Sequence, residues 1–316
     1  MSLPREFSII RRYFAPLAGP GALDLTDDAA VITPPAGRDL VVTADTMVQG
    51  VHYLPDELPK NVARKLLRVN LSDIAAMGAI PLGYLLTLSV PRGTPDAWFE
   101  SFAKGLAADQ ARYNISLLGG DTTSTPGPVS LSVMMFGHVA HGAALRRGGA
   151  EAGDDLWVTG TIGNGVLGLR ALRGEIPDPD GTLAAHYRFP EPRLGLALQG
   201  IAHAAMDISD GLLQDSGHMA RASGLALTLD ISRVPLSPAG KAAGPDFVSS
   251  GTAGGDDYEL LLAVPPSQEP ALRAAARSCE IIVNKIGWFD AGEPSVVLID
   301  AEGRRLAAGG GGWSHL

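Results

Sequence analysis

The chain has 316 residues, of which 46% are hydrophobic and 19% are charged. This length exceeds the size at which one hydrophobic core usually keeps growing, so we expect two domains, each with its own core. The net charge of −9 argues against nucleic acid as the main partner, and the single cysteine, Cys279, excludes an internal disulfide and a cysteine-based zinc cluster.

Apolar runs that end in glycine or aspartate alternate with segments of helical period, which is typical of mixed α/β and α+β proteins. In the first half we expect helices over 7–14, 61–77 and 96–113 and strands over 40–44, 115–118 and 130–139. The glycine-rich, basic stretch 142–153 predicts a boundary between a domain 1–141 and a domain 142–316. In the second half we expect helices over 165–173, 193–203 and 212–222 and strands over 155–159, 225–231, 258–264, 281–287 and 296–299.

The sequence shows no export signal at its N-terminus and no membrane-spanning segment. The first residues lack a basic stretch followed by an apolar run, and no window reaches about 18 uninterrupted apolar residues. Together with the low cysteine content, which fits a reducing compartment, this predicts a cytoplasmic protein that is neither exported nor membrane-spanning.

Acidic side chains recur at turns, and most of them follow an apolar run. They are Asp27-Asp28, Asp45, Asp73, Asp121, Asp207 and Asp210. We expect these carboxylates to project from the ends of strands or buried segments, where a charge is costly unless it is compensated. Mg²⁺ is the natural compensation, because one or two carboxylates and the phosphates of a substrate complete its oxygen shell. The alternative for each aspartate alone is a solvated turn or a helix cap.

Asp73 interrupts the apolar stripe of its predicted helix. Val62, Leu66 and Val69 step along one face by four and three residues, and Asp73 occupies the next position. A carboxylate there requires a partner, which a metal ion would supply. The alternative is an N-cap or a buried ion pair with a residue such as Arg64 or Lys65.

A competing pattern is Gly163-Asn164-Gly165-Val166-Leu167-Gly168, which fits the GxGxxG fingerprint of dinucleotide sites and follows a predicted strand. However, the acidic ribose ligand expected about 20 residues later would fall in the proline-broken stretch 177–180. A nicotinamide cofactor is therefore disfavoured, and the sequence contains no GxxxxGK[ST] phosphate loop. Among the histidines, His52 lies in a loop just past Asp45 and could touch a substrate.

Taken in order, these acidic motifs resemble those of thiamine-monophosphate kinases, and the resemblance extends over nearly the whole chain. The segments that carry it are 27–30, 43–52, 70–78, 119–122, 207–211 and 254–260. The resemblance implies the two-domain fold of aminoimidazole ribonucleotide synthetase, with an N-terminal α/β domain whose sheet forms a dimer barrel and a C-terminal α+β domain. It also implies a homodimer that converts ATP and thiamine monophosphate to ADP and thiamine diphosphate.

The same resemblance implies roles for individual residues. Asp45, Asp73, Asp210 and Arg147 are the expected catalytic residues, and several Mg²⁺ ions are expected as cofactors. The expected metal ligands are Asp28, Thr43, Ala44 through its backbone, Asp45, Asp73, Asp121, Asp207 and Asp210. The expected ATP contacts are Gly120, Asp121, Arg147 and Ser209, and the expected substrate contacts are His52, Asp256 and Trp313. The chain departs from the family at Thr26, where glycine is usual, and at Asp256, where glutamate is usual.

The chemistry implied by this family suits the residues present. A phosphate monoester has a second pKa of about 6, so it attacks as an anion and requires no general base. Catalysis then consists of positioning and of electrostatic stabilisation, and an aromatic residue such as Trp313 suits a cationic thiazolium. The alternatives are an aminoimidazole ribonucleotide synthetase-like ligase and a catalytically silent metal-binding homologue. Selenophosphate synthetases and hydrogenase-maturation relatives would need a cysteine near one end of the chain, and Cys279 lies elsewhere.

Overall fold

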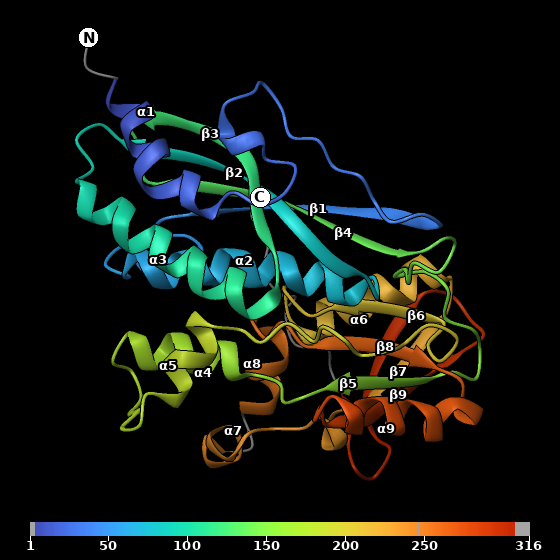
Figure 1. Ribbon diagram of the computed structural model, residues 1–316. Helices are drawn as coiled ribbons and strands as arrows, with labels where there is room; N and C mark the ends of the chain where they lie inside the picture. The colour runs from blue at the N-terminus through green and yellow to red at the C-terminus, as the bar shows by residue number, and fades with distance from the viewer. Residues whose placement is uncertain (1–3, 245–246, 307–316) are drawn as a thin grey trace. The chain divides into compact units, whose positions relative to one another are not determined.

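The computed structural model describes residues 4–244 and 247–306 (Figure 1). The chain forms two compact units. Unit 1 combines the chain up to Ile74 with Ala79–Gly142, and unit 2 combines Ala75–Gly78 with the chain from Ala143 onward. Among the described residues, no helix is both long and apolar enough to cross a bilayer.

Unit 1 is built on a four-stranded sheet in the order β1-β4-β2-β3. β4 runs antiparallel to both β1 and β2, and β2 is parallel to β3. The elements are α1 (Arg5–Ile9) with a π turn over Ile10–Phe14, short 3-10 turns over Ala15–Leu17 and Leu23–Leu25, β1 (Arg38–Val48), α2 (Pro59–Ala76), β2 (Ile80–Pro91), α3 (Asp96–Tyr113), β3 (Ser116–Thr125) and β4 (Ser130–Ala140).

The two faces of this sheet differ in what covers them. α2 and α3 lie along one face (Figure 1), and the side chains on that face, such as Tyr84, Val133 and Met135, are fully buried. On the other face Val42 of β1 is 52% exposed and Met134 of β4 is 42% exposed. Because successive side chains of a strand point to opposite faces, β1 and β4 leave apolar side chains exposed on this second face.

Unit 2 is built on a mixed seven-stranded sheet in the order β11-β10-β7-β9-β5-β8-β6. β10 is parallel to β7, and the other neighbours are antiparallel. Its strands are β5 (Asp155–Thr159), β6 (Ala204–Asp207), β7 (Ala226–Asp230), β8 (Leu260–Val264), β9 (Val283–Asp290), β10 (Ser295–Ile299) and β11 (Arg305–Leu306). Its helices are α4 (Asn164–Leu172), α5 (Thr182–Arg188), α6 (Leu212–Ser223), α7 (Pro238–Ala242), α8 (Phe247–Ala253) and α9 (Glu269–Ser278), with 3-10 turns over Ile231–Arg233 and Pro266–Gln268.

The core of unit 2 has two layers, one on each face of the sheet. Met219 of α6 packs with Val158 and Leu261 in one cluster. Leu272 of α9 packs with Trp157 and Leu262 in the other. The strands β5 and β8, and the edge strand β6 beside them, are buried along their whole length, which follows from their largely apolar sequences. Acidic residues at the ends of such strands are thereby held by a rigid support.

Several sequence predictions are corrected by this fold. The predicted helix over 193–203 is wrong: the segment is a series of turns in which Gly195 and Gly200 have φ of 80° and 74°. A positive φ is incompatible with a right-handed helix and favours glycine. The buried side chains of this segment, such as Leu198, pack into the core without helical structure. β2 and α9 are further elements that the sequence patterns did not indicate.

The predicted strand ends are also corrected. β1 continues to Val48 and β3 to Thr125, so Asp45 and Asp121 lie inside strands and not at their ends. Asp207, in contrast, is the last residue of β6.

Candidate functional site

In unit 1, Thr43 and Asp45 of β1 lie beside Asn70 and Asp73 of α2. The Thr43 hydroxyl donates to Asp73 Oδ2 at 2.5 Å, and the backbone N–H of Asp45 donates to Asn70 Oδ1 at 3.2 Å. Asn70 is fully buried, and its Nδ2 donates to the carbonyl of Leu66 at 2.9 Å. Residues two apart on a strand and three apart on a helix share a face, so this sequence spacing brings the two pairs together.

The carboxylates of Asp45 and Asp73 oppose each other electrostatically. Burial, and after it the neighbouring charge of Asp73, raises the pKa of Asp45 to about 6. Two half-buried carboxylates in this arrangement favour a cation between them. The donor set is all oxygen, which suits Mg²⁺.

His52 follows this pair in the loop after β1. Its Nδ1 accepts the backbone N–H of Val48 at 2.9 Å, and Lys65 Nζ donates to its carbonyl at 3.3 Å. A neutral ring whose Nδ1 accepts carries its proton on Nε2. The loop therefore orients His52 as a hydrogen-bond donor.

A second group of predicted residues lines a cavity of about 530 Å³ in unit 1. Asp28, Gly120 and Asp121 share its wall with apolar side chains such as Leu85 and Phe136. At Gly120 a Cβ would lie 1.8 Å from the carbonyl oxygen of Leu86, so only glycine fits. Unit 1 thus brings together Thr43, Asp45 and Asp73 in one group and Asp28, Gly120 and Asp121 in another.

In unit 2, the turn Asp207–Asp210 connects β6 to α6 and is fixed by Asp215 of that helix. Asp215 Oδ2 accepts the backbone N–H groups of Ser209 and Asp210, both at 3.1 Å. Asp215 is only 2% exposed. Burial raises its pKa to about 7, helped by the charge of Asp210 and opposed by these N–H groups and by Arg147. Asp215 therefore fixes the orientation of the Ser209 and Asp210 backbone N–H groups in this turn.

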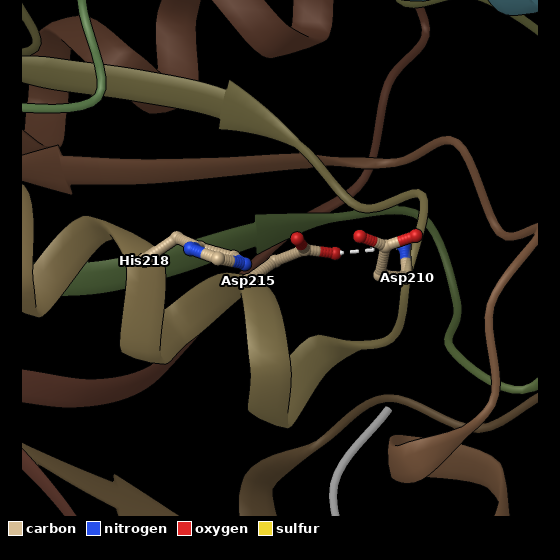
Figure 2. Close-up of side chains that lie close together, drawn as sticks. All are labelled: Asp210, Asp215 and His218. Carbon is tan, nitrogen blue, oxygen red and sulfur yellow. Dashed lines mark hydrogen bonds between the residues drawn. The ribbon is translucent and has the colours of Figure 1, made fainter. Parts of the chain in front are cut away.

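Asp215 and His218 are site residues that the sequence reasoning missed. Together with Asp210 they form a group whose oxygen and nitrogen atoms lie within 4.8 Å of one another, and Figure 2 shows Asp215 between the other two. The available signal was their spacing of three residues on a predicted helix that begins just after Asp210, since such residues share a helix face. The spacing of His218 to the other histidines is not that of a metal site, so the histidines alone gave no such signal.

The segment Gly254–Tyr258 lies directly against the Asp207–Asp210 turn. The N–H of Asp256 donates to the Ser209 carbonyl at 3.0 Å, and the N–H of Tyr258 donates to the Ile208 carbonyl at 2.8 Å. A Cβ at Gly255 would lie 2.2 Å from the Ser209 carbonyl oxygen. The predicted ATP contact Ser209 and the predicted substrate contact Asp256 are therefore neighbours.

The glycine pattern at Gly163–Gly168 serves the same segment and not a dinucleotide. Asp257 Oδ2 accepts the N–H of Gly163 at 2.8 Å and its Oδ1 accepts the N–H of Gly165 at 3.0 Å. Burial raises the pKa of Asp257 to about 7, against the effect of these two N–H groups. In a dinucleotide site these donors would face a pyrophosphate, so an internal carboxylate takes the place of the cofactor.

Three of the predicted residues remain. Ala44 lies on β1 between Thr43 and Asp45. Arg147 is exposed. Its positive charge opposes the rise in the pKa of Asp215. The pKa of His218 is lowered by burial, then by the charge of Arg221, and then by that of Arg147. Trp313 lies outside the described residues.

Fold and site together define a class of protein. Residues 26–139 match the AIR synthase related protein N-terminal domain, and residues 151–300 match the C-terminal domain of the same family. A hydrogenase maturation protein, HypE, in complex with ATP has the same fold, with a TM-score of 0.79 at 16% identity over 96% of this chain and 94% of that one.

Within this class the similarity is stronger to one group. The thiamine-monophosphate kinase of Caulobacter vibrioides is 48% identical over 99% of this chain and 91% of its own length, and that of Escherichia coli strain K12 is 38% identical over 90% of each. The crystal structure of the Stenotrophomonas maltophilia thiamine-monophosphate kinase superposes with a TM-score of 0.80 at 40% identity, covering 87% of this chain and 89% of that one. The chain belongs to the thiamine-monophosphate kinases of the AIR synthase related family.

Proposed function

We propose that the protein transfers the γ-phosphoryl group of ATP to the phosphate of thiamine monophosphate, giving ADP and thiamine diphosphate. The 48% identical relative is a thiamine-monophosphate kinase that matches nearly the full chain. A structural neighbour, AaThiL, was solved in complex with AMPPCP and TMP, and it superposes with a TM-score of 0.78 at 29% identity over 92% of this chain. The geometric observation that carries the proposal is the group in which Thr43 bonds the carboxylate of Asp73 and Asn70 bonds the backbone of Asp45. It gathers oxygen donors of β1 and α2 as a metal-dependent phosphotransferase requires.

The transfer is a direct in-line displacement at the γ-phosphorus. An oxygen of the acceptor monophosphate forms the new P–O bond while the bond to ADP breaks, and the acceptor needs no base because it is already an anion. The catalytic residues are Asp45, Asp73, Asp210 and Arg147. Arg147 faces the transferred phosphoryl group with a fixed positive charge, which stabilises the charge that develops there.

Mg²⁺ fits the acidic residues of both units. The ligands would be oxygen donors that lie on strands β1, β3 and β6, on helix α2 and in turns: Asp28, Thr43, the backbone of Ala44, Asp45, Asp73, Asp121, Asp207 and Asp210. When bound, Mg²⁺ would neutralise charge on the phosphates that the reaction brings together. Thr43 holds Asp73 through its hydroxyl, and Asp215 holds the Ser209–Asp210 backbone, so the chain itself orients the carboxylates.

The two substrates are assigned to two sets of residues. Gly120, Asp121, Arg147 and Ser209 contact ATP, and His52, Asp256 and Trp313 contact thiamine monophosphate. The backbone hydrogen bond between Ser209 and Asp256 supports this assignment, because it holds a proposed ATP contact next to a proposed contact of thiamine monophosphate. His52 donates from Nε2, as its bonded Nδ1 requires.

The open face of the unit 1 sheet supports a homodimer, in which the sheets of two copies form a barrel. Leu40 and Val42 of β1 are 45% and 52% exposed, and the register places Val42 beside Phe136 and Ala44 beside Met134. A continuous apolar surface on one face of a sheet is typical of a contact with another chain. The single cysteine favours a reducing compartment, and we assign the protein to the cytoplasm.

The test is incubation of the purified protein with ATP, Mg²⁺ and thiamine monophosphate, with thiamine diphosphate measured by mass spectrometry. Formation of thiamine diphosphate that requires all three components supports the proposal. Release of ADP only with a substrate of aminoimidazole ribonucleotide synthetase would favour that ligase instead. Calorimetric titration with ATP, with and without Mg²⁺, separates both from a silent homologue, which would show no metal-dependent nucleotide binding.

A further inference from the structure

Asp257 joins two parts of unit 2 that are far apart in the sequence. Its carboxylate receives the N–H groups of Gly163 and Gly165, 94 and 92 residues away, at the start of α4. Gly163 has φ of 89°, a conformation that turns its N–H toward the carboxylate and favours glycine. The N–H groups of the glycine turn are thus bound by the side chain of Asp257, from a distant part of the same chain.

Close backbone contact reinforces this connection. A Cβ at Gly165 would lie 2.5 Å from the carbonyl oxygen of Gly255, and a Cβ at Gly254 would lie 2.0 Å from Val166 Cγ2. The residues on both sides of Asp257 adopt unusual conformations, since Asp256 and Tyr258 have φ of 69° and 51°. Such conformations persist in non-glycine residues only where the surroundings hold them. The carboxylate of Asp257 is a principal element of those surroundings.

The segment Gly254–Tyr258 also contacts the Asp207–Asp210 turn, which contains the proposed ATP contact Ser209. Asp256 donates to the Ser209 carbonyl and Tyr258 to the Ile208 carbonyl. The N–H groups of Ser209 and Asp210 are bound independently by Asp215. The turn therefore has an anchor that is independent of Asp257, whereas Asp256 is held by the turn on one side and by Asp257 on the other.

We propose that Asp257 is a positioning residue, which fixes the backbone of Asp256 through Gly163 and Gly165 and thereby sets the affinity for the acceptor substrate. The inference rests on the proposed function, since it concerns the residue assigned to thiamine monophosphate. It gives the glycine pattern at Gly163–Gly168 a role in substrate binding without any cofactor.

The test is the variant Asp257→Asn, which keeps the shape of the side chain but can accept from only one of the two N–H groups. We expect KM for thiamine monophosphate to rise about tenfold, which is the effect of losing one hydrogen bond to a charged group. We expect KM for ATP to stay within about twofold, because Asp215 still holds Ser209 and Asp210. Both constants are measured from thiamine diphosphate formation.

The matched control is Asp178→Asn. Asp178 accepts the N–H groups of Leu183 and Ala184 at the start of α5 at 3.1 and 2.9 Å, so it has the same bonding pattern on a different helix. This variant should change the melting temperature and leave both KM values unchanged. A second variant, Gly165→Ala, perturbs the same contact from the opposite side, and it too should raise KM for thiamine monophosphate.

Unchanged KM for thiamine monophosphate in both Asp257→Asn and Gly165→Ala would overturn the inference while leaving the function intact. An equal rise in Asp178→Asn would do the same, because it would show a general loss of helix stability. Failure of the wild-type protein to form thiamine diphosphate would instead overturn the proposed function and the inference with it.

Discussion

Replacing Asp45 by asparagine tests whether the Asp45 carboxylate is required for turnover while its buried charge lowers the free energy of unfolding. The folded protein raises its pKa from 3.8 to about 6 through burial and the charge of Asp73. A difference of about 2 pKa units corresponds to at most about 3 kcal/mol of unfolding free energy. Asparagine has the same shape and no charge, so the variant should lose turnover and gain stability.

The sign of the pH dependence follows from the direction of the shift. The pKa of Asp45 is higher in the folded protein than in the unfolded chain, so ionisation of Asp45 lowers the free energy of unfolding. This loss is absent below about pH 4, grows as Asp45 ionises in the unfolded chain, and is complete above about pH 6. Asp45→Asn should therefore match wild type at about pH 4 and exceed it at about pH 7.5. The gain there is at most about 3 kcal/mol, or on the order of 10 °C in melting temperature for a unit of this size.

The assay is thermal unfolding by circular dichroism at both pH values, with a chelator present. The control is Asp121→Asn, since Asp121 is exposed and its removal should change stability by less than about 0.5 kcal/mol. A loss of stability in Asp45→Asn at about pH 7.5, or a gain that is equal at both pH values, would refute the reasoning. Asp45 would then be a structural residue.

The remaining predictions concern metal binding, the dimer and a buried ion pair. Adding Mg²⁺ should raise the melting temperature of wild type more than that of Asp45→Asn, and equal shifts in the two proteins would contradict the metal role. Val42→Asp should turn the dimer into a monomer in sedimentation velocity, because it places a charge in the open apolar face, and an unchanged mass would contradict the barrel. Arg193→Met should lower unfolding free energy in urea by about 3 kcal/mol, because it leaves the buried Glu259 without its bidentate partner. The exposed pair Lys104–Glu100 gives the control, since Lys104→Met should cost under about 1 kcal/mol.

The local patterns of the sequence determine much of this protein. Three long helices were predicted close to their observed positions, at α2, α3 and α6, because each has a helical period and an apolar face. The buried strands β5 and β8 follow from continuous apolar runs bounded by turn residues. The acidic turns point to a phosphotransferase because few other chemistries need so many carboxylates on rigid elements.

Other features depend on contacts between residues far apart in the sequence, and local patterns cannot encode them. The segment 193–203 has a helix-like composition, yet its buried leucines and left-handed glycines make it a series of turns. The pattern at Gly163–Gly165 fits a cofactor site until Asp257, distant in the chain, is seen to occupy its N–H groups. The residue types decide which chemistry is available to the protein, and the tertiary structure decides which backbone groups each carboxylate binds, because hydrogen bonds form by distance in space and not along the chain.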